Sequence, residues 1–317
     1  MGGNYVDTQK LIQNLRELSP KEYTWKLALY SAKKSRDGVE LEWGACAMAD
    51  IAGWADALRE QLLEKGVADR TVEPYTPFLP VESIGALERS DELIREPMHD
   101  ALLSIKNAHV YSPEDLASGL FPAPTGYAFY GEKLDVKGEV EAQTLFIRRA
   151  NPLVSPKKAR LCVTHGDTVA VSEKPIFKFP QTVDFLLLDG ICYFVTQALE
   201  KDFGLVNRHA AICERRLAAL AEASVLSDYE RFELVALSPK NARKFADFDP
   251  EVLETVARLS IEERADFLGN HGVSIDSEGR MDSGDPEQCE LIVDLLCSRS
   301  CHDALGRLST GRAITPR

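Results

Sequence analysis

The chain has 317 residues, of which 44% are apolar and 27% charged, a composition that excludes disordered and fibrous proteins. Its net charge of −13 argues against a generic basic nucleic-acid-binding domain. The excess is local, because residues 247–290 hold 13 acids against 3 cations. A basic surface elsewhere stays compatible with the acidic total, since screening over about 8 Å weakens the opposition between distant charges.

The seven cysteines are scattered and form no C-x-x-C pair. Together with the lack of a secretory signal, they predict free thiols in the reducing cytoplasm. The longest strongly apolar stretch, residues 185–195, is interrupted by Asp189-Gly190. It is shorter than the roughly 20 residues that span a bilayer, so we predict a cytoplasmic protein that does not itself cross a membrane.

The N-terminal part alternates helical and extended patterns. Apolar residues at helical spacing predict a first helix, and the Arg36-Asp37-Gly38 turn predicts a hairpin between two strands. Two further helices follow an amphipathic pattern, the second with Pro97 inside it. The expected elements are a helix at 5–18, strands at 23–31 and 39–47, a helix at 49–65, an extended connector at 73–81 and a helix at 91–107.

A proline- and glycine-containing segment, residues 119–126, predicts a domain boundary. We therefore expect an N-terminal α/β module at residues 1–120 and a second domain at 121–317. Strands are expected at 127–131, 141–149, 160–164 and 169–171, then a hairpin of 182–188 with 191–196 around Asp189-Gly190. Helices are expected at 198–203, at 205–222 and through most of the chain after 227. The fold class is α+β, with a central antiparallel sheet, flanking helices and a helical C-terminal region.

A basic segment stands out within this acidic chain. Residues 148–160 contain five cations and no acid: Arg148, Arg149, Lys157, Lys158 and Arg160. Such residues neutralise nucleic-acid phosphates without reading base sequence. The alternative is a solvated strand end and loop, in which one of the two adjacent arginines points inward to an acid, because neighbouring strand positions face opposite sides.

Three further arginines fall in the helix expected at 205–222. Arg208 and Arg215 are seven residues apart, about two turns, and so share one face with each other, while Arg216 lies beside them. They could extend a phosphate-binding surface. The nearby Glu214 makes ordinary helix salt bridges the alternative outcome.

Catalytic patterns are weaker than the basic segment. A metal-dependent nuclease could be built from Asp184, Asp189 and Glu173-Lys174, but nothing in the sequence places these groups together. The acidic segment 276–285 lacks the order of a calcium loop. Cys289, Cys297, Cys301 and His302 lack the paired spacing of structural zinc, and His209 with Cys213 lacks an acidic partner. We expect no metal, no cofactor and no enzymatic activity.

The middle of the chain resembles a known family. A strand ending in Ile147-Arg148-Arg149 is followed by Ser155-Pro156-Lys157-Lys158, Pro175-Ile176-Phe177 and Val183-Asp184. This order, with the hairpin that follows it and residues 199–203 before a long helix, resembles the KwaB family of the Kiwa anti-phage defence system. The resemblance covers residues 126–222, and the total length also fits.

The resemblance implies a cytosolic component of a bacterial defence system that binds DNA and self-assembles into a dimer or tetramer. It also implies a membrane-embedded, KwaA-like partner at the inner membrane. We therefore expect DNA binding without cleavage. The closest alternative is an adaptor that joins a membrane partner to copies of itself and ignores DNA; a metal-dependent nuclease is the more distant one.

Overall fold

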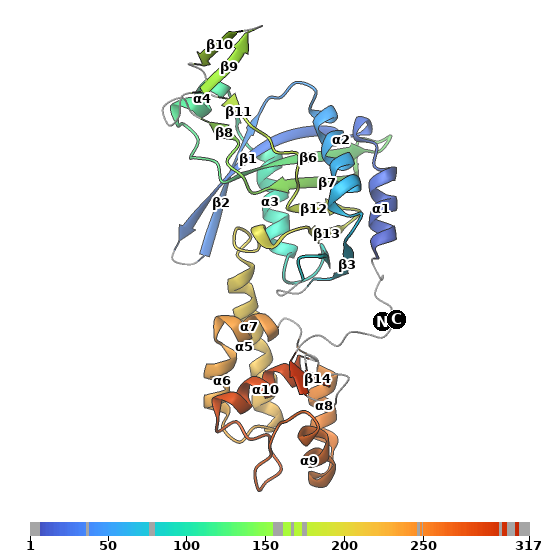
Figure 1. Cartoon of the computed structure of the whole chain (residues 1–317), viewed down its shortest axis with the longest axis vertical. Coiled ribbons are helices and arrows are strands. Elements are labelled where there is room, and N and C mark those ends of the chain that lie inside the picture. Colours follow the sequence, from blue (N-terminus) through green and yellow to red (C-terminus); the bar gives the residue numbers. More distant parts are fainter. Residues whose placement is uncertain are drawn as a thin grey trace. The chain divides into compact units, whose positions relative to one another are not determined.

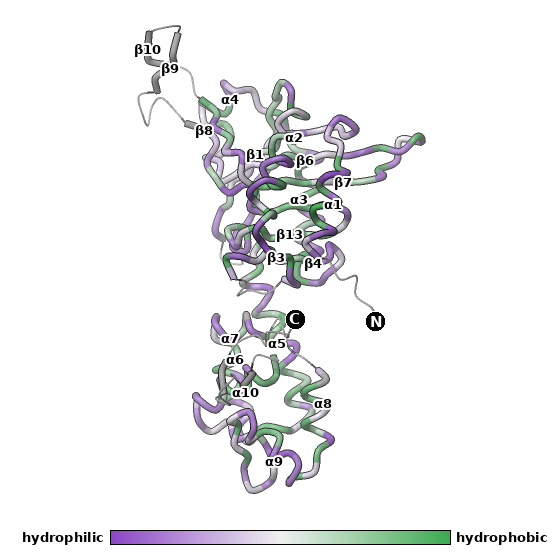
Figure 2. The backbone as a smooth tube through the Cα atoms, turned by 45° about the vertical axis from the view of Figure 1, so that its right-hand side comes forward, coloured by the Kyte–Doolittle hydropathy of each residue, from purple (hydrophilic) through white to green (hydrophobic). Residues whose placement is uncertain are grey.

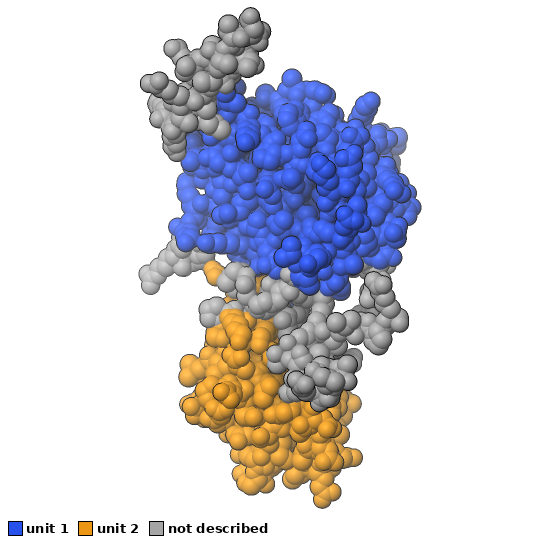
Figure 3. All heavy atoms as spheres, in the orientation of Figure 1, with its two compact units in different colours: residues 1–205 blue, residues 206–317 orange. Residues whose placement is uncertain are grey.

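The computed structural model describes residues 7–35, 38–75, 80–154, 161–165, 168–172, 176–245, 248, 250–297, 300–302 and 308–310. The chain divides into two compact units, residues 1–205 and 206–317 (Figure 3). Each unit has its own hydrophobic core. This division differs from the expected boundary at 120/121. The reason is that β1 (Thr24–Ser35) pairs with β6 (Gly126–Leu134) across the expected boundary, so both belong to one sheet.

Unit 1 is built on a mixed sheet whose described part has nine strands, in the order β3-β4-β13-β12-β7-β6-β1-β2-β5 (Figure 1). The α+β class is confirmed. The sheet is antiparallel except at β3–β4 and β2–β5, where the strands run parallel. The remaining bounds are β2 Gly38–Cys46, β3 Thr71–Pro74, β4 Ser83–Glu88, β5 Val110–Tyr111, β7 Val140–Arg148, β12 Phe185–Leu188 and β13 Ile191–Phe194.

Alternate strand residues line the two faces of this sheet, because successive side chains point to opposite sides. On one face, Leu27, Phe129 and Phe146 pack with α1 (Thr8–Glu17) and α2 (Ile51–Gln61). On the other lies α3 (Arg95–Asn107), whose C-terminal carbonyls accept hydrogen bonds from Lys26. Figure 2 shows apolar residues concentrated along the central strands. Both faces of the central strands are therefore buried.

Shorter elements complete unit 1. A 3-10 turn precedes β1, a π turn continues α2, and the helix α4 follows β5. Two small two-stranded sheets, β8 with β11 and β9 with β10, lie between β7 and β12 in the sequence. The bounds are η1 Pro20–Glu22, η2 Leu62–Gly66, α4 Pro113–Ser118, β8 Leu153–Val154, β9 Leu161–His165, β10 Thr168–Ser172, β11 Ile176–Phe177 and η3 Gln197–Leu199.

Unit 2 is mainly helical, as expected. Its core holds Phe232, Phe245 and Ile292, all fully buried. The bounds are α5 Leu205–Ala223, α6 Tyr229–Ala236, α7 Pro239–Lys244, α8 Pro250–Arg258, α9 Ile261–Gly269, α10 Pro286–Leu296, β14 Ser300–His302 and β15 Leu308–Thr310. The first residue of α5 is the last residue of unit 1.

Several local predictions are confirmed and others are corrected. Asp189 and Gly190 have positive φ angles of 51° and 73°, as the predicted two-residue turn requires. The sequence left open whether Pro97 kinks or restarts the helix expected at 91–107; α3 begins at Arg95, so Pro97 lies in its first turn, where a backbone N–H would have no intrahelical acceptor. The connector expected at 73–81 begins inside β3. The helix expected at 198–203 is only a 3-10 turn, and Gly204 with a φ of 67° separates it from α5.

Candidate nucleic-acid interface

Arg148 and Asp184 form a buried ion pair where β7 ends. Arg148 Nη1 donates to Asp184 Oδ1 at 2.6 Å, and the side chain of Asp184 is only 2% exposed. The same carboxylate accepts from Thr196 Oγ1 at 2.8 Å and from the backbone N–H of Arg149 at 2.7 Å. Because three donors surround it, the buried charge is well compensated.

Arg149 pairs with a second buried acid. Its Nε donates to Asp202 Oδ2 at 2.9 Å, and Tyr30 OH donates to the same oxygen at 3.1 Å. Burial, followed by the adjacent Asp202 charge, raises the pKa of Tyr30 far above its ordinary value, which keeps the phenol a donor. Both arginines of the pair are thus attached to aspartates inside unit 1.

These four residues, Arg148, Arg149, Asp184 and Asp202, form what we call the arginine–aspartate cluster. It attaches the segment after β13 to the sheet, because Asp202 follows η3 while Tyr30 and Arg149 belong to β1 and the end of β7. Glu200, also buried, accepts a hydrogen bond from Tyr75 OH at 2.7 Å. Strand alternation predicted at most one inward-pointing arginine, whereas in the structure both arginines are bound to acids.

The cluster has no net charge, yet its two arginine side chains remain partly exposed to solvent. The side chains of Arg148 and Arg149 are 30% and 44% exposed. Within the described residues, Arg149 makes a side-chain hydrogen bond only through Nε. Among the described residues its two terminal nitrogens have no hydrogen-bond acceptor, so they are available to an anion on a guanidinium that Asp202 already orients.

None of the other predicted residues is described as part of the arginine–aspartate cluster. Lys157, Lys158 and Arg160 lie outside the described residues, between β8 and β9. Arg208, Arg215 and Arg216 lie on α5 and belong to unit 2. Five of the eight predicted residues are thus described, and only Arg148 and Arg149 are joined in one cluster.

The α5 arginines are engaged in unit 2 in different ways. Arg216 Nη1 donates to the carbonyl oxygen of Phe245, and its guanidinium lies 5.8 Å from the ring centroid of Phe248. Those contacts fix it against the core of unit 2. Arg208 and Arg215 also have interaction partners, so none of the three is a free cation.

The residues proposed for a nuclease do not assemble a metal site. Asp184 is committed to Arg148 and Thr196, while Asp189 stands at an exposed turn and accepts from Asn14 Nδ2 at 3.4 Å. Glu173 and Lys174 lie outside the described residues. Throughout the described part of the chain, no group of three or more His, Cys, Asp or Glu is placed to hold a metal ion.

The thiol and imidazole candidates that the structure describes are buried, whereas the side chains of Cys301 and His302 lie outside its described part. Burial raises the pKa of the Cys213 thiol to about 12, which opposes formation of a nucleophilic thiolate. Its neighbour His209 is fully buried. Cys289 and Cys297 are buried free cysteines.

The acidic segment 276–285 also has a structural explanation. Asp276 accepts hydrogen bonds from the backbone N–H groups of Glu278 and Arg280 and pairs with the Arg280 guanidinium at 2.8 Å. These contacts, led by the Arg280 backbone bond, lower the pKa of Asp276. Asp276 is thus bound within its own loop, while the segment keeps an acidic balance of four acids to one cation.

Comparisons with known proteins return no match to a family model, to a curated protein or to a solved structure. In the part of the chain that the structure describes, no helix is long and apolar enough to cross a membrane.

Proposed function

We propose that this protein is a cytoplasmic DNA-binding effector of a bacterial anti-phage defence system, which holds DNA through backbone phosphates and performs no catalysis. The observation that carries the proposal is the environment of Arg149. Its side chain is 44% exposed, and the buried carboxylate of Asp202 orients its guanidinium. Within the described residues, both terminal nitrogens of that guanidinium are available. An arginine fixed in this way loses little side-chain entropy when it binds a phosphate.

The net attraction for DNA has to come from neighbours of the cluster. Asp184 and Asp202 cancel the charges of Arg148 and Arg149, whereas Lys157, Lys158 and Arg160 add three cations with no acid between residues 148 and 160. In this proposal the lysines and Arg160 attract the polyanion, Arg149 positions one phosphate, and Arg148 maintains the fold. Arg208, Arg215 and Arg216 remain a secondary contact.

The wider setting rests on the resemblance to the KwaB family. It supports a membrane-embedded, KwaA-like partner, a location at the inner face of the inner membrane through that partner, and self-assembly into a dimer or tetramer. Binding that blocks DNA, rather than cutting it, agrees with the commitment of Asp184 to Arg148 and Thr196.

The test neutralises one pair without leaving a buried charge. Arg149→Gln/Asp202→Asn removes both charges, and the amide oxygen of the introduced asparagine still offers Tyr30 an acceptor. The control, Lys33→Gln/Glu42→Gln, neutralises an exposed pair in the same unit whose charged atoms are 2.5 Å apart. Affinity for duplex DNA is measured by fluorescence anisotropy over a range of salt concentrations.

We expect the Arg149 variant to lower the slope of log affinity against log salt by about 0.9, one phosphate, and the control to leave it unchanged. An unchanged slope in both variants would remove Arg149 from the interface. Equal changes in both would attribute the effect to loss of any ion pair.

A second candidate, the adaptor, is favoured by exposed aliphatic residues at the turn between β6 and β7. Val136 is fully exposed, and the cross-strand neighbours Leu134 and Val140 are 49% and 43% exposed. Apolar side chains gathered at a hairpin tip are typical of a protein contact. Wild-type protein that ignores duplex DNA at low salt, yet copurifies with a membrane partner only while Val136 is intact, would favour the adaptor.

A further inference from the structure

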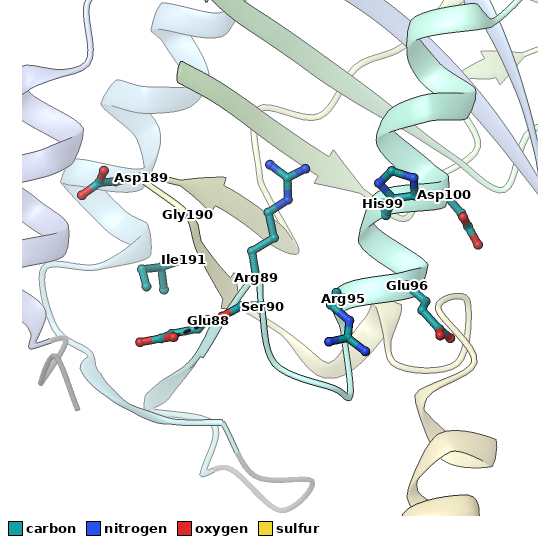
Figure 4. Close-up of a pocket in the computed structure, with 10 residues that line it drawn as sticks. All are labelled: Glu88, Arg89, Ser90, Arg95, Glu96, His99, Asp100, Asp189, Gly190 and Ile191. Atoms are coloured by element: carbon teal, nitrogen blue, oxygen red, sulfur yellow. Dashed lines mark hydrogen bonds between the residues drawn. The ribbon is translucent and has the colours of Figure 1, made fainter. Parts of the chain in front are cut away.

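Unit 1 contains an open hollow of about 1000 Å³ beside the N-terminal end of α3. Three short segments enclose it: the loop from β4 into α3, the first two turns of α3, and the turn between β12 and β13 (Figure 4). It shares no residue with the arginine–aspartate cluster. We call it the α3 hollow.

The segments around the hollow are held in place by backbone hydrogen bonds. The N–H of Arg89 donates to the carbonyl of Gly190 at 2.9 Å, which joins the end of β4 to the β12–β13 turn. Within the loop, Asp91 accepts from the backbone N–H of Arg95 at 2.8 Å through its carbonyl, and from that of Leu93 at 2.8 Å through its side chain. The hollow is therefore preformed.

Arg89 is oriented by a chain of hydrogen bonds across the sheet. Its Nη1 donates to Gln143 Oε1 at 2.8 Å, and Gln143 Nε2 donates to Tyr130 OH at 2.7 Å. Tyr130 in turn donates to Glu132, which pairs with Lys106 at 3.2 Å. Among the described residues, Gln143 accepts from one of the five guanidinium N–H groups of Arg89, so the other four are available to a ligand.

Two more cationic or donor side chains reach the hollow from α3. Arg95 and His99 are four residues apart and so lie on one face of the helix; both are exposed. No side-chain hydrogen bond or ion pair involves Arg95 within the described residues. In Figure 4, the guanidinium of Arg89 extends to the level of the His99 ring, whereas the guanidinium of Arg95, at the first turn of the helix, is directed the other way.

Four carboxylates also line the hollow, those of Glu88, Glu96, Asp100 and Asp189. Glu96 and Asp100 also stand four apart, on a neighbouring strip of α3, and Figure 4 shows both pointing away from Arg89. On the opposite side, Glu88 accepts from Ser90 Oγ at 3.2 Å and Asp189 accepts from Asn14 at 3.4 Å. Because these four acids outnumber the two arginines, a long polyanion crossing the hollow would meet carboxylates, and the hollow suits only a compact anion that stays beside the arginines.

We propose that the α3 hollow binds a small molecule that bears more than one phosphate group, which Arg89 and His99 contact at one end of the hollow and Arg95 at the other. Arginine suits this role because its planar fork makes two parallel bonds to a phosphate. The inference goes beyond the proposed DNA binding and uses different residues, so either can fail without the other.

The test uses the full chain and two probes, inorganic pyrophosphate and ADP, in isothermal titration calorimetry. The variant is Arg95→Gln/His99→Gln, because these side chains are exposed and their replacement leaves the backbone bonds of the loop intact. The control is Arg16→Gln, an exposed arginine on α1 in the same unit. Thermal unfolding checks that all three proteins are folded.

We expect both probes to bind the wild type and the control alike, and the double variant to bind about tenfold or more weakly, because two charge-assisted contacts are lost. Binding of ADP alone also supports the proposal and assigns a nucleoside phosphate. Absence of binding by both probes, equal affinity in the double variant, or displacement of the probe by single-stranded DNA would overturn it.

Discussion

The arginine–aspartate cluster and the α3 hollow lie in the same unit and are both rich in charge, yet they differ in what their cations face. In the cluster, Arg148 and Arg149 each meet a carboxylate that is 2% or 4% exposed. In the hollow, Arg89 is held by a neutral amide, Gln143, and Arg95 has no side-chain partner among the described residues.

This difference shows that a cluster of cations in the sequence does not by itself predict a positively charged surface. Arg148 and Arg149 are neighbours in the most basic segment of the chain, but their partners neutralise them. Arg89 and Arg95 stand among acids in the sequence, but their side chains face open space (Figure 4). A buried carboxylate partner neutralises the charge of an arginine and ties it to the fold, whereas a neutral partner leaves that charge uncompensated.

The largest expected difference between the two sites is in stability, and replacing one arginine of each site by alanine tests it. Arg148→Ala leaves the buried Asp184 without its guanidinium, and we expect a loss of about 3 kcal/mol in the free energy of unfolding. Arg95→Ala should change it by no more than about 0.5 kcal/mol, because the side chain is exposed. Urea denaturation followed by circular dichroism measures both. Equal losses would show that the two arginines have the same role.

A smaller effect is expected from Tyr30→Phe, which removes one donor to Asp202 and keeps the ring. We expect a loss of about 1 kcal/mol, typical of one hydrogen bond, in the same denaturation experiment. The same variant should leave DNA affinity unchanged, because the hydrogen bond from Arg149 to Asp202, which orients the guanidinium, does not involve Tyr30. A stability equal to that of the wild type would argue that this hydrogen bond contributes nothing to the attachment of the segment after β13.

The smallest expected difference between the two sites is in how the free energy of unfolding falls at alkaline pH. Burial, followed by the Asp202 charge, raises the pKa of Tyr30, so the folded state favours the neutral phenol. This contribution is complete below the unfolded value of about 10 and is lost as pH rises above it. Tyr30→Phe should therefore flatten the fall of stability at alkaline pH, whereas Arg95→Gln should leave it unchanged. A fall of equal steepness in Tyr30→Phe and wild type would contradict the assignment.

Local chemistry explains which parts of the fold the sequence could predict. The 189–190 turn needs positive φ angles, and Asp-Gly supplies them, so that hairpin was predictable. Helical periodicity likewise predicted α1 and α5. The domain boundary was not predictable, because pairing of β1 with β6 joins segments about a hundred residues apart and leaves no local sign.

The candidate site divides in the same way. An inward arginine at the end of β7 was one alternative that strand alternation predicted. Its partner was not predicted, because Asp184 was considered only as a metal ligand. Asp202 was not predicted either, because its contact with Tyr30 and Arg149 depends on how the segment after β13 returns over the sheet. The α3 hollow was missed because Arg89 and His99 come from separate elements that only the fold brings together.

The central claim is that DNA is attracted by cations that have no buried acid as partner. Its most direct measurement is the salt dependence of duplex DNA affinity for Lys157→Gln/Lys158→Gln, with Lys21→Gln/Lys65→Gln as a control of equal charge on exposed lysines. The account predicts that the slope against log salt falls by about 1.8 in the first variant, two phosphates, and stays unchanged in the control. A slope unchanged in the first variant, or reduced equally in both, would contradict it.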